Sequence, residues 1–116
     1  MRFLLILNDP PYGTERSYNA LRLARSLGKD EGAELRVFMM GDAVGCAVSG
    51  QKTPDGYYNL DTMVRSIARK RASVGCCGTC MDARGITEAM LSDGVRRSSM
   101  DELAEWTRWA EKVITF

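Results

Sequence analysis

Short apolar runs alternate with segments of helical periodicity along this chain. Residues 2–8 (RFLLILN) form a continuous apolar run that ends at Asp9 and two prolines, which is typical of a buried strand running into a loop. Residues 35–40 (LRVFMM) repeat this pattern. Shorter runs at 73–76 and 113–116, and a weak one that begins at Val95, bring the number of predicted strands to five.

Apolar residues recur at helical spacing between these runs. One helix is predicted to follow the N-cap Thr14 and to continue to Leu27, because Gly28 and Gly32 stop the pattern. Further helices are predicted at residues 43–47 after the N-cap Asp42, at 60–68, at 87–92, and after the capping box formed by Ser99 and Glu102. Residues 49–58 form the one long loop, and we expect them to be a lid.

This alternation of strands and helices predicts an α/β fold. The helical segments are long enough for crossover connections, so residues 1–116 are expected to form a single domain. The predicted architecture is a three-layer sandwich with a five-stranded, mostly parallel sheet covered on both faces. In such sheets ligands bind beyond the carboxyl ends of strands, and the loop at residues 76–80 begins at one of these ends.

Composition excludes several classes of protein. The chain has 116 residues, of which 45% are hydrophobic, and this is enough to build a core. Sixteen Lys and Arg against 15 Asp and Glu leave a formal charge of +1, which makes nucleic acid or an anionic membrane an unexpected main partner. No apolar run approaches the ~20 residues that span a bilayer, and no secretory signal is recognised, so a cytoplasmic location is expected.

Four cysteines and the absence of histidine define the candidate chemistry. Cys76, Cys77 and Cys80 crowd together at the predicted end of the third strand, whereas Cys46 lies alone. Without imidazole, the remaining chemistry is attack of a thiolate on sulfur, activated by helix N–H groups. Cys77 and Cys80 are the predicted reactive pair, with Arg84 as the nearest cation along the chain, and Cys46 and Cys76 are interpreted as core thiols.

The segment from Cys77 to Gly85 (CGTCMDARG) resembles the active cysteine segment of the DsrE/DsrF/TusD family of sulfur-relay proteins. The N-terminal stretch from Ile6 to Ala20 and the turn from Met40 to Val44 also resemble small single-chain members of that family. The resemblance covers essentially the whole chain. It implies a DsrE-like sandwich that forms homo-oligomers, and a cysteine, here Cys77, that carries sulfur as a persulfide for a donor or acceptor protein.

Cys80 departs from the family pattern and keeps other functions open. A second thiol three residues after Cys77 can resolve a persulfide to a disulfide, so a dithiol redox role competes with sulfur carriage. A further alternative is a non-catalytic oligomeric module that binds a small thiol or a metal. No cofactor and no metal site within the chain are expected, because a closed zinc site normally needs four ligands.

Weaker candidates lie at the same predicted edge of the sheet. Asp9, Arg16 and Asp42 are candidate substrate-binding residues together with Arg84, although loop formation, solvated charge and helix capping also explain them. The basic cluster of Arg65, Arg69, Lys70 and Arg71 is interpreted as a solvated helix face or a subunit contact. No aromatic residues are interleaved with this cluster to stack on the bases of an RNA.

Overall fold

A computed structural model describes residues 1–70 and 72–116 of the chain. Its sheet has five strands, in the spatial order β4-β3-β2-β1-β5, and every neighbouring pair is parallel. The predicted strands are confirmed with ends that shift by one or two residues. Their bounds are Arg2–Leu7 for β1, Glu34–Met39 for β2, Ser73–Cys77 for β3, Val95–Ser98 for β4 and Lys112–Thr115 for β5.

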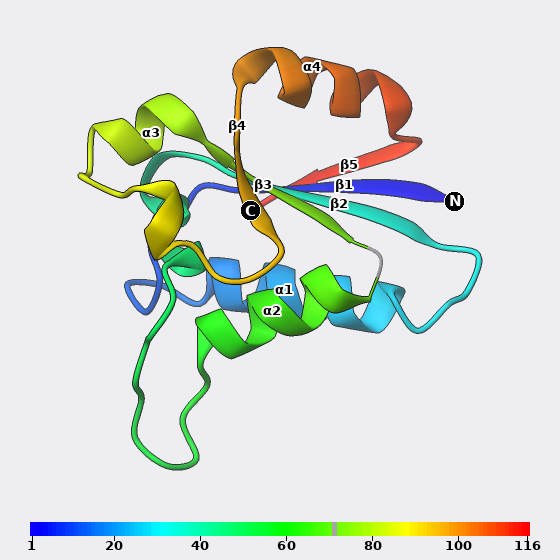
Figure 1. Cartoon of the computed structure of the whole chain (residues 1–116). Helices are drawn as coiled ribbons and strands as arrows, with labels where there is room; N and C mark the ends of the chain where they lie inside the picture. The colour runs from blue at the N-terminus through cyan, green and yellow to red at the C-terminus, as the bar shows by residue number, and fades with distance from the viewer. Residues whose placement is uncertain (71) are drawn as a thin grey trace.

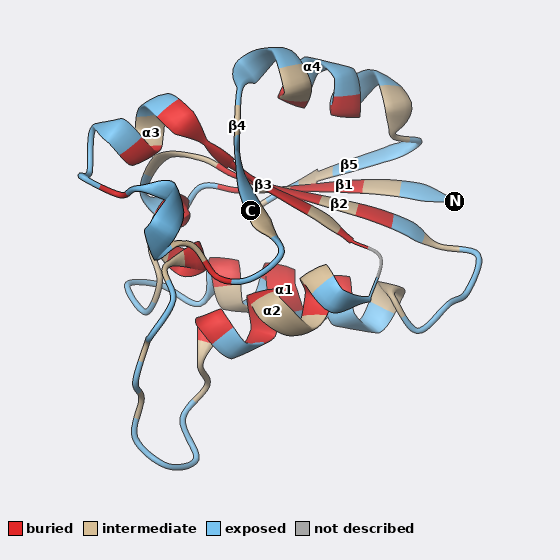
Figure 2. Ribbon diagram, viewed as in Figure 1, coloured by how far each residue is buried: buried red, intermediate tan, exposed pale blue. Residues whose placement is uncertain are grey.

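Helices cover both faces of this sheet, which confirms the three-layer sandwich. The helices α1 (Arg16–Leu27) and α2 (Leu60–Arg69) lie side by side on one face, and α4 (Met100–Trp109) lies on the other (Figure 1). The buried residues follow the central strands and the inner sides of α1 and α2 (Figure 2). The short helix α3 (Gly78–Asp82) follows β3 directly, at the carboxyl edge of the sheet.

Strand register determines which side chains meet each helical layer. Leu35 packs near α1 and α2, and Val37, two residues further along β2, therefore points to the same face. Phe38 points to the opposite face, where its ring meets Trp106 of α4 edge to face at 6.1 Å. Gly75 is the register partner of Phe38, and a Cβ there would lie 3.3 Å from the Trp106 ring. A glycine at this position of β3 thus lets α4 pack closely.

The two predicted helix caps differ in outcome. The helix α1 begins at Arg16 with Glu15 as its N-cap, and the Glu15 side chain makes no capping hydrogen bond. One residue earlier, Thr14 Oγ1 accepts from the Arg16 amide at 3.3 Å, as a capping hydroxyl does, and it also donates to Asp9 Oδ2 at 2.6 Å. Asp42 lies inside the 3₁₀ helix η1 (Gly41–Ala47), whose N-cap is Met40. Its carboxylate is engaged in an ion pair with Arg84.

The start of α4 follows the predicted capping box in part. Ser99 Oγ accepts a hydrogen bond from the Glu102 backbone N–H at 3.2 Å, as expected. The Glu102 carboxylate, however, accepts from the Ser98 hydroxyl and from the Arg96 guanidinium instead of the Ser99 amide. Partial burial raises the pKa of Glu102, but these hydrogen bonds outweigh it and hold the pKa below its ordinary value.

The long loop between η1 and α2 does not occupy the position expected of a lid over the cysteines. It projects on the side of α1 and α2, away from α3 (Figure 1). The Gln51 side-chain amide anchors it by donating to the carbonyls of Val48 at 2.8 Å and Cys46 at 3.0 Å. Another 3₁₀ turn, η2 (Glu88–Met90), lies within the predicted helix at 87–92. No helix in the described part of the chain is long and apolar enough to cross a membrane.

Candidate functional site

The reactive cysteines lie where β3 ends and α3 begins. Cys77 is both the last residue of β3 and the N-cap of α3, with an extended backbone at φ −57° and ψ 116°. The strand order reverses between β1 and β5, because β2, β3 and β4 lie on one side of β1 and β5 lies on the other. Many doubly wound folds bind ligands at such a switch point, whereas the cysteines follow β3. The thiol chemistry, and not this topological rule, therefore selects the candidate site.

Cys77 has an environment that stabilises a thiolate. Its side chain is nearly buried, with 6% of the residue exposed, and its Sγ lies 3.3 Å from the Thr79 hydroxyl. Burial raises the pKa of the Cys77 thiol, but hydrogen bonds from the Cys80 side chain, the Thr79 hydroxyl and the two backbone amides of these residues outweigh it. The pKa of Cys77 therefore lies below the ordinary value.

The pKa of Cys80 shifts in the opposite direction. It is half-buried one turn along α3, and burial together with its hydrogen bond to Cys77 raises the pKa of its thiol. In the most favourable arrangement Cys77 is the thiolate and Cys80 is the thiol that donates to it. The two neighbouring sulfurs are consequently unequal, with one prepared to attack and the other protonated nearby.

The structure brings Asp42 and Arg84 together beside this pair. Arg84 Nη2 lies 2.7 Å and Nε 3.0 Å from Asp42 Oδ1, and Arg84 Nη1 donates to the Cys80 carbonyl at 3.1 Å. This ion pair connects η1, which follows β2, to α3, which follows β3. The positive charge of Arg84 acts on Cys80, where it lowers the pKa against the larger effects of burial and of Cys77. The charge of Arg84 therefore bears on the pKa of Cys80 and not on that of Cys77.

Asp9 and Arg16 form a separate group at the start of α1. Arg16 Nε lies 3.9 Å from Asp9 Oδ2, and the Arg16 side chain is 72% exposed. The Asp9 backbone carbonyl accepts from the Ser17 hydroxyl at 2.7 Å and from Cys46 Sγ at 3.8 Å. These contacts fix the loop after β1. Neither residue contacts Cys77 or Cys80 through a hydrogen bond or ion pair between described residues.

The sequence interpretation gave no role to Thr79, Asp82 or Arg97, which lie around α3. Thr79 supplies the hydroxyl at Cys77, and its place in the first turn after the cysteine is a local signal that was available. Arg97 of β4 forms two hydrogen bonds with Asp82, at 2.8 Å and 2.9 Å. A Cβ at Gly78 would lie 2.7 Å from the Arg97 guanidinium carbon, so this glycine lets Arg97 lie against the start of α3.

Cys46 and Cys76 are core thiols, as the sequence predicts. Both are fully buried, and burial raises the pKa of each thiol to about 12. They are therefore protonated at neutral pH and serve as unreactive internal references for Cys77 and Cys80. Among the described residues, no group of three or more His, Cys, Asp or Glu side chains is arranged to hold a metal ion.

Comparisons with known proteins agree with this geometry. The chain matches the DsrE/DsrF-like family over residues 1–116. It is 41% identical over 116 residues to protein YchN of Escherichia coli strain K12, covering 99% of this chain and 98% of YchN. It is 33% identical to an uncharacterized protein of Methanocaldococcus jannaschii over the full length of both chains.

Solved structures show the same fold. The crystal structure of YchN from E. coli superposes with a TM-score of 0.94 over 100% of this chain and 99% of that chain. A protein of unknown function from Methanobacterium thermoautotrophicum, at 14% identity, superposes with a TM-score of 0.80 over 99% of this chain and 98% of that chain. Sequence and structure together show that this chain belongs to the DsrE/DsrF-like family.

Proposed function

We propose that this protein is a sulfur-relay protein that carries sulfane sulfur as a persulfide on Cys77, with Cys80 as the resolving thiol. The observation that carries the proposal is the unequal thiol pair at the junction of β3 and α3. Cys77 has a lowered pKa and Cys80 a raised one, and the Thr79 hydroxyl lies 3.3 Å from Cys77 Sγ. Family membership supports a role in sulfur relay.

In the first step the Cys77 thiolate attacks the outer sulfur of a donor persulfide, R–S–SH. The donor S–S bond breaks, a new S–S bond forms at Cys77, and the donor leaves as the thiolate R–S⁻. No net oxidation or reduction occurs in this step. The low exposure of Cys77 restricts access to its sulfur, so a donor has to present its persulfide in a fitted orientation.

The bound sulfur then has two fates. An acceptor thiolate can attack the outer sulfur and regenerate the Cys77 thiolate, which completes the relay. Alternatively, Cys80 loses its proton to solvent and attacks Cys77 Sγ, which forms a Cys77–Cys80 disulfide and expels HS⁻. This second route reduces the sulfane sulfur by two electrons, and an external dithiol must reduce the disulfide before another cycle.

The test is intact and peptide mass spectrometry after incubation with a cysteine desulfurase and cysteine, or with inorganic polysulfide. The parent chain is compared with Cys77→Ser, Cys80→Ser and the control Cys46→Ala, which removes a core thiol. We expect a gain of one sulfur on Cys77 that is short-lived in the parent and longer-lived in Cys80→Ser. The control should gain sulfur like the parent, and Cys77→Ser should gain none.

Two results would replace this proposal. If neither the parent nor Cys80→Ser gains sulfur, but the parent forms the Cys77–Cys80 disulfide with a defined potential, the protein is a dithiol redox protein. If a small thiol or a metal ion binds without covalent change, the protein is a binding module. Sulfur that accumulates on Cys46 or Cys76 would contradict the assignment of those residues as core thiols.

We further propose that the protein works as a homo-oligomer in the cytoplasm. Val113 of β5 and Met100 of α4 are 42% and 57% exposed, which leaves apolar surface on the side of the sheet that carries α4. Trp109 of α4 is half-buried, and the Arg36 guanidinium lies over its ring at 3.9 Å from the ring centre. Light scattering after size-exclusion chromatography at micromolar concentration tests the oligomer, and a monomer would contradict it.

A further inference from the structure

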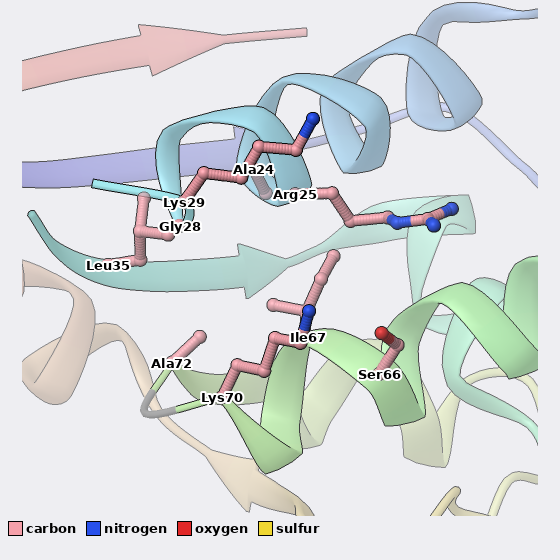
Figure 3. Close-up of a pocket in the computed structure, with 9 residues that line it drawn as sticks. All are labelled: Ala24, Arg25, Gly28, Lys29, Leu35, Ser66, Ile67, Lys70 and Ala72. Atoms are coloured by element: carbon pink, nitrogen blue, oxygen red, sulfur yellow. The ribbon is translucent and has the colours of Figure 1, made fainter. Parts of the chain in front are cut away.

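A cationic groove runs between α1 and α2, on the face of the sheet opposite α4. Arg25 and Lys29 project from α1 and its end, and Ser66 and Lys70 lie on the α2 side (Figure 3). Arg22, one turn before Arg25, extends the cationic row toward the N-terminus of α1. We use the name cationic groove for this depression, whose floor at the Lys70 end consists of small and aliphatic side chains.

The cations of this groove have no carboxylate partners. None of Arg22, Arg25, Lys29 and Lys70 forms an ion pair with another described residue. The helix α1 contains no Asp or Glu at all. Cations in the last turn of a helix also stabilise its dipole, but this effect does not explain Arg22 in the middle of α1.

The acidic residue of α2 does not neutralise the groove. Asp61 is 2% exposed, and its two oxygens accept hydrogen bonds from the Ser92 hydroxyl and the Gly50 amide. It forms an ion pair only with Arg65 among the described residues, at 3.3 Å. Asp30 and Glu31 border the far end of the groove near Lys70. The chain as a whole has a formal charge of +1, so its net charge does not reveal this local row of cations.

All four tyrosines of the chain gather where the cationic groove opens toward the N-termini of α1 and α2. Tyr58 stacks on Tyr18 at a centroid distance of 4.0 Å and on Tyr57 at 5.0 Å, and Tyr12 stacks on the other rings through Tyr58 at 5.6 Å. Tyr57 is the outermost member, with 58% of the residue exposed. An exposed aromatic ring can stack on a nucleic acid base, and a row of cations beside it can bind the phosphates of the same strand.

The rest of the cluster is rigidly held, so that Tyr57 stacks on a fixed platform. Tyr12 has a left-handed backbone, φ 63°, which is unfavourable for a side chain of this size. Its hydroxyl donates to Gln51 Oε1 and accepts from the Leu60 amide at 3.1 Å, which connects the loop after β1 to the start of α2. The Arg22 guanidinium lies 5.5 Å from the centre of the Tyr18 ring and joins the tyrosines to the cationic row.

We propose that the cationic groove binds a single-stranded nucleic acid, with its phosphates along Arg22, Arg25, Lys29 and Lys70 and a base stacked on Tyr57. A row of unpaired cations beside a rigid aromatic platform combines the two features that bind single strands without reading their sequence. An acidic protein would use the cations but not the exposed ring. The proposal departs from the expectation drawn from net charge, which averages the two faces of the sandwich.

The test is fluorescence anisotropy of a labelled 12-nucleotide oligothymidylate with the full-length protein at 50 and 200 mM salt. With four phosphates neutralised, a slope of about −0.7 per phosphate predicts an affinity loss of about 50-fold between these concentrations. The double variant Arg25→Gln, Lys29→Gln removes two of the four contacts, so it should bind more weakly at 50 mM salt and lose only about 7-fold between the same concentrations.

Two further comparisons show whether base stacking contributes to binding and whether the effect of charge is specific to the groove. Tyr57→Ala should weaken binding about tenfold at either salt concentration, and Tyr57→Phe should restore it, because base stacking does not need the hydroxyl. The control Arg108→Gln, Lys112→Gln removes the same charge from exposed positions outside the groove and should bind like the parent. Thermal melting of each variant shows whether the fold is retained.

Several outcomes would overturn the proposal. Absence of saturable binding at 50 mM salt contradicts it, and so does an equal loss of affinity in the control variant. If Tyr57→Ala binds like the parent, the groove is a general anion surface and not a site for single strands. Stronger binding to polyglutamate or to phosphatidylglycerol vesicles than to the oligonucleotide would assign the groove to an acidic protein or to a membrane instead. None of these readouts depends on sulfur transfer.

Discussion

Thr79→Val tests whether hydrogen bonding at α3 activates Cys77. The substitution removes the hydroxyl that lies 3.3 Å from Cys77 Sγ and keeps the branched shape of the side chain. Thr79 is exposed, so the change should leave the core intact. Cys80 and the backbone amides still face the sulfur, and the pKa of Cys77 should therefore rise without reaching that of a buried thiol.

The magnitude follows from the strength of one hydrogen bond to a charged group. Such a bond contributes about 1.5 kcal/mol at the lower end of its range, which corresponds to a rise of about one pKa unit. At any pH well below the pKa of Cys77 in both proteins, the thiolate fraction of Cys77 would fall about tenfold. A more basic thiolate is intrinsically more nucleophilic, with a Brønsted coefficient of about 0.45, so the net rate of alkylation falls only about threefold.

Above both pKa values the order should reverse. There Cys77 is fully ionised in the parent and in Thr79→Val, and the more basic thiolate of the variant should react about threefold faster. The two rate profiles therefore cross. A purely structural loss of α3 would instead expose Cys77 and accelerate its alkylation at every pH.

The assay is alkylation by iodoacetamide between pH 5 and 10, with quenching and peptide mass spectrometry to read each cysteine separately. Cys46 and Cys76 should remain unmodified, because burial raises the pKa of both thiols to about 12. Thr62→Val is the matched control, since this threonine is also exposed on a helix but lies far along the chain from the cysteines. Parallel profiles for the parent and Thr79→Val, or faster alkylation of Cys80 than of Cys77 in the parent at pH 7, would refute the reasoning.

Two predictions concern stability, measured by urea unfolding. Glu102→Gln should lower the free energy of unfolding by about 1 kcal/mol at pH 7, because the charged carboxylate accepts from Arg96. The pKa of Glu102 in the folded state is below its unfolded value of 4.5, so the stability difference is complete above pH 4.5 and should shrink as the pH falls below it. A constant difference from pH 7 to 3 would contradict the effect. Gly94→Ala should lower the free energy of unfolding by about 2 kcal/mol or more, because φ is +87° and the new Cβ would lie 2.8 Å from Ala68 Cβ. The control Gly56→Ala, at φ +81° with no atom within 4 Å of the new Cβ, measures the backbone cost alone. Equal losses of stability in the two variants would exclude the clash with Ala68.

The sequence alone determined the five strands and the helices α1, α2 and α4 in their order, but it did not predict the short helix α3. The apolar runs at 2–8 and 35–40 and the helical spacing at 60–68 predicted β1, β2 and α2 to within about two residues, because these signals depend on neighbours within one or two turns. The position of Cys77 at a strand end followed from the same local pattern. So did the interpretation of Cys46 and Cys76 as core thiols, which the structure confirms.

The loop and helix starts were less predictable. Asp42 has the right chemistry for an N-cap, but its carboxylate pairs instead with Arg84, and Thr14 divides its hydroxyl between the Arg16 amide and Asp9. The choice between a cap and an ion pair depends on what the folded chain brings within about 3 Å of the carboxylate or hydroxyl, and this is not encoded in the adjacent residues. Arg84 illustrates the same point, since its partner Asp42 lies 42 positions away.

Only the tertiary structure decided which residues share a site. Strand order brings Arg97 of β4 beside the start of α3, and it separates the Asp9 and Arg16 pair from the cysteines. Parallel strands can be ordered in several ways with the same local sequence signals, so these contacts follow from long-range packing.

The cationic groove depends on packing in the same way. Its tyrosines come from the loop after β1, from α1 and from the loop before α2, so no stretch of sequence shows aromatic and basic residues together. Net charge could not reveal it either, because a sum over the chain carries no information on the face to which each side chain points. Helical periodicity placed Arg22, Arg25 and Lys29 on one side of α1, but only the packing of α1 against α2 made that side a groove.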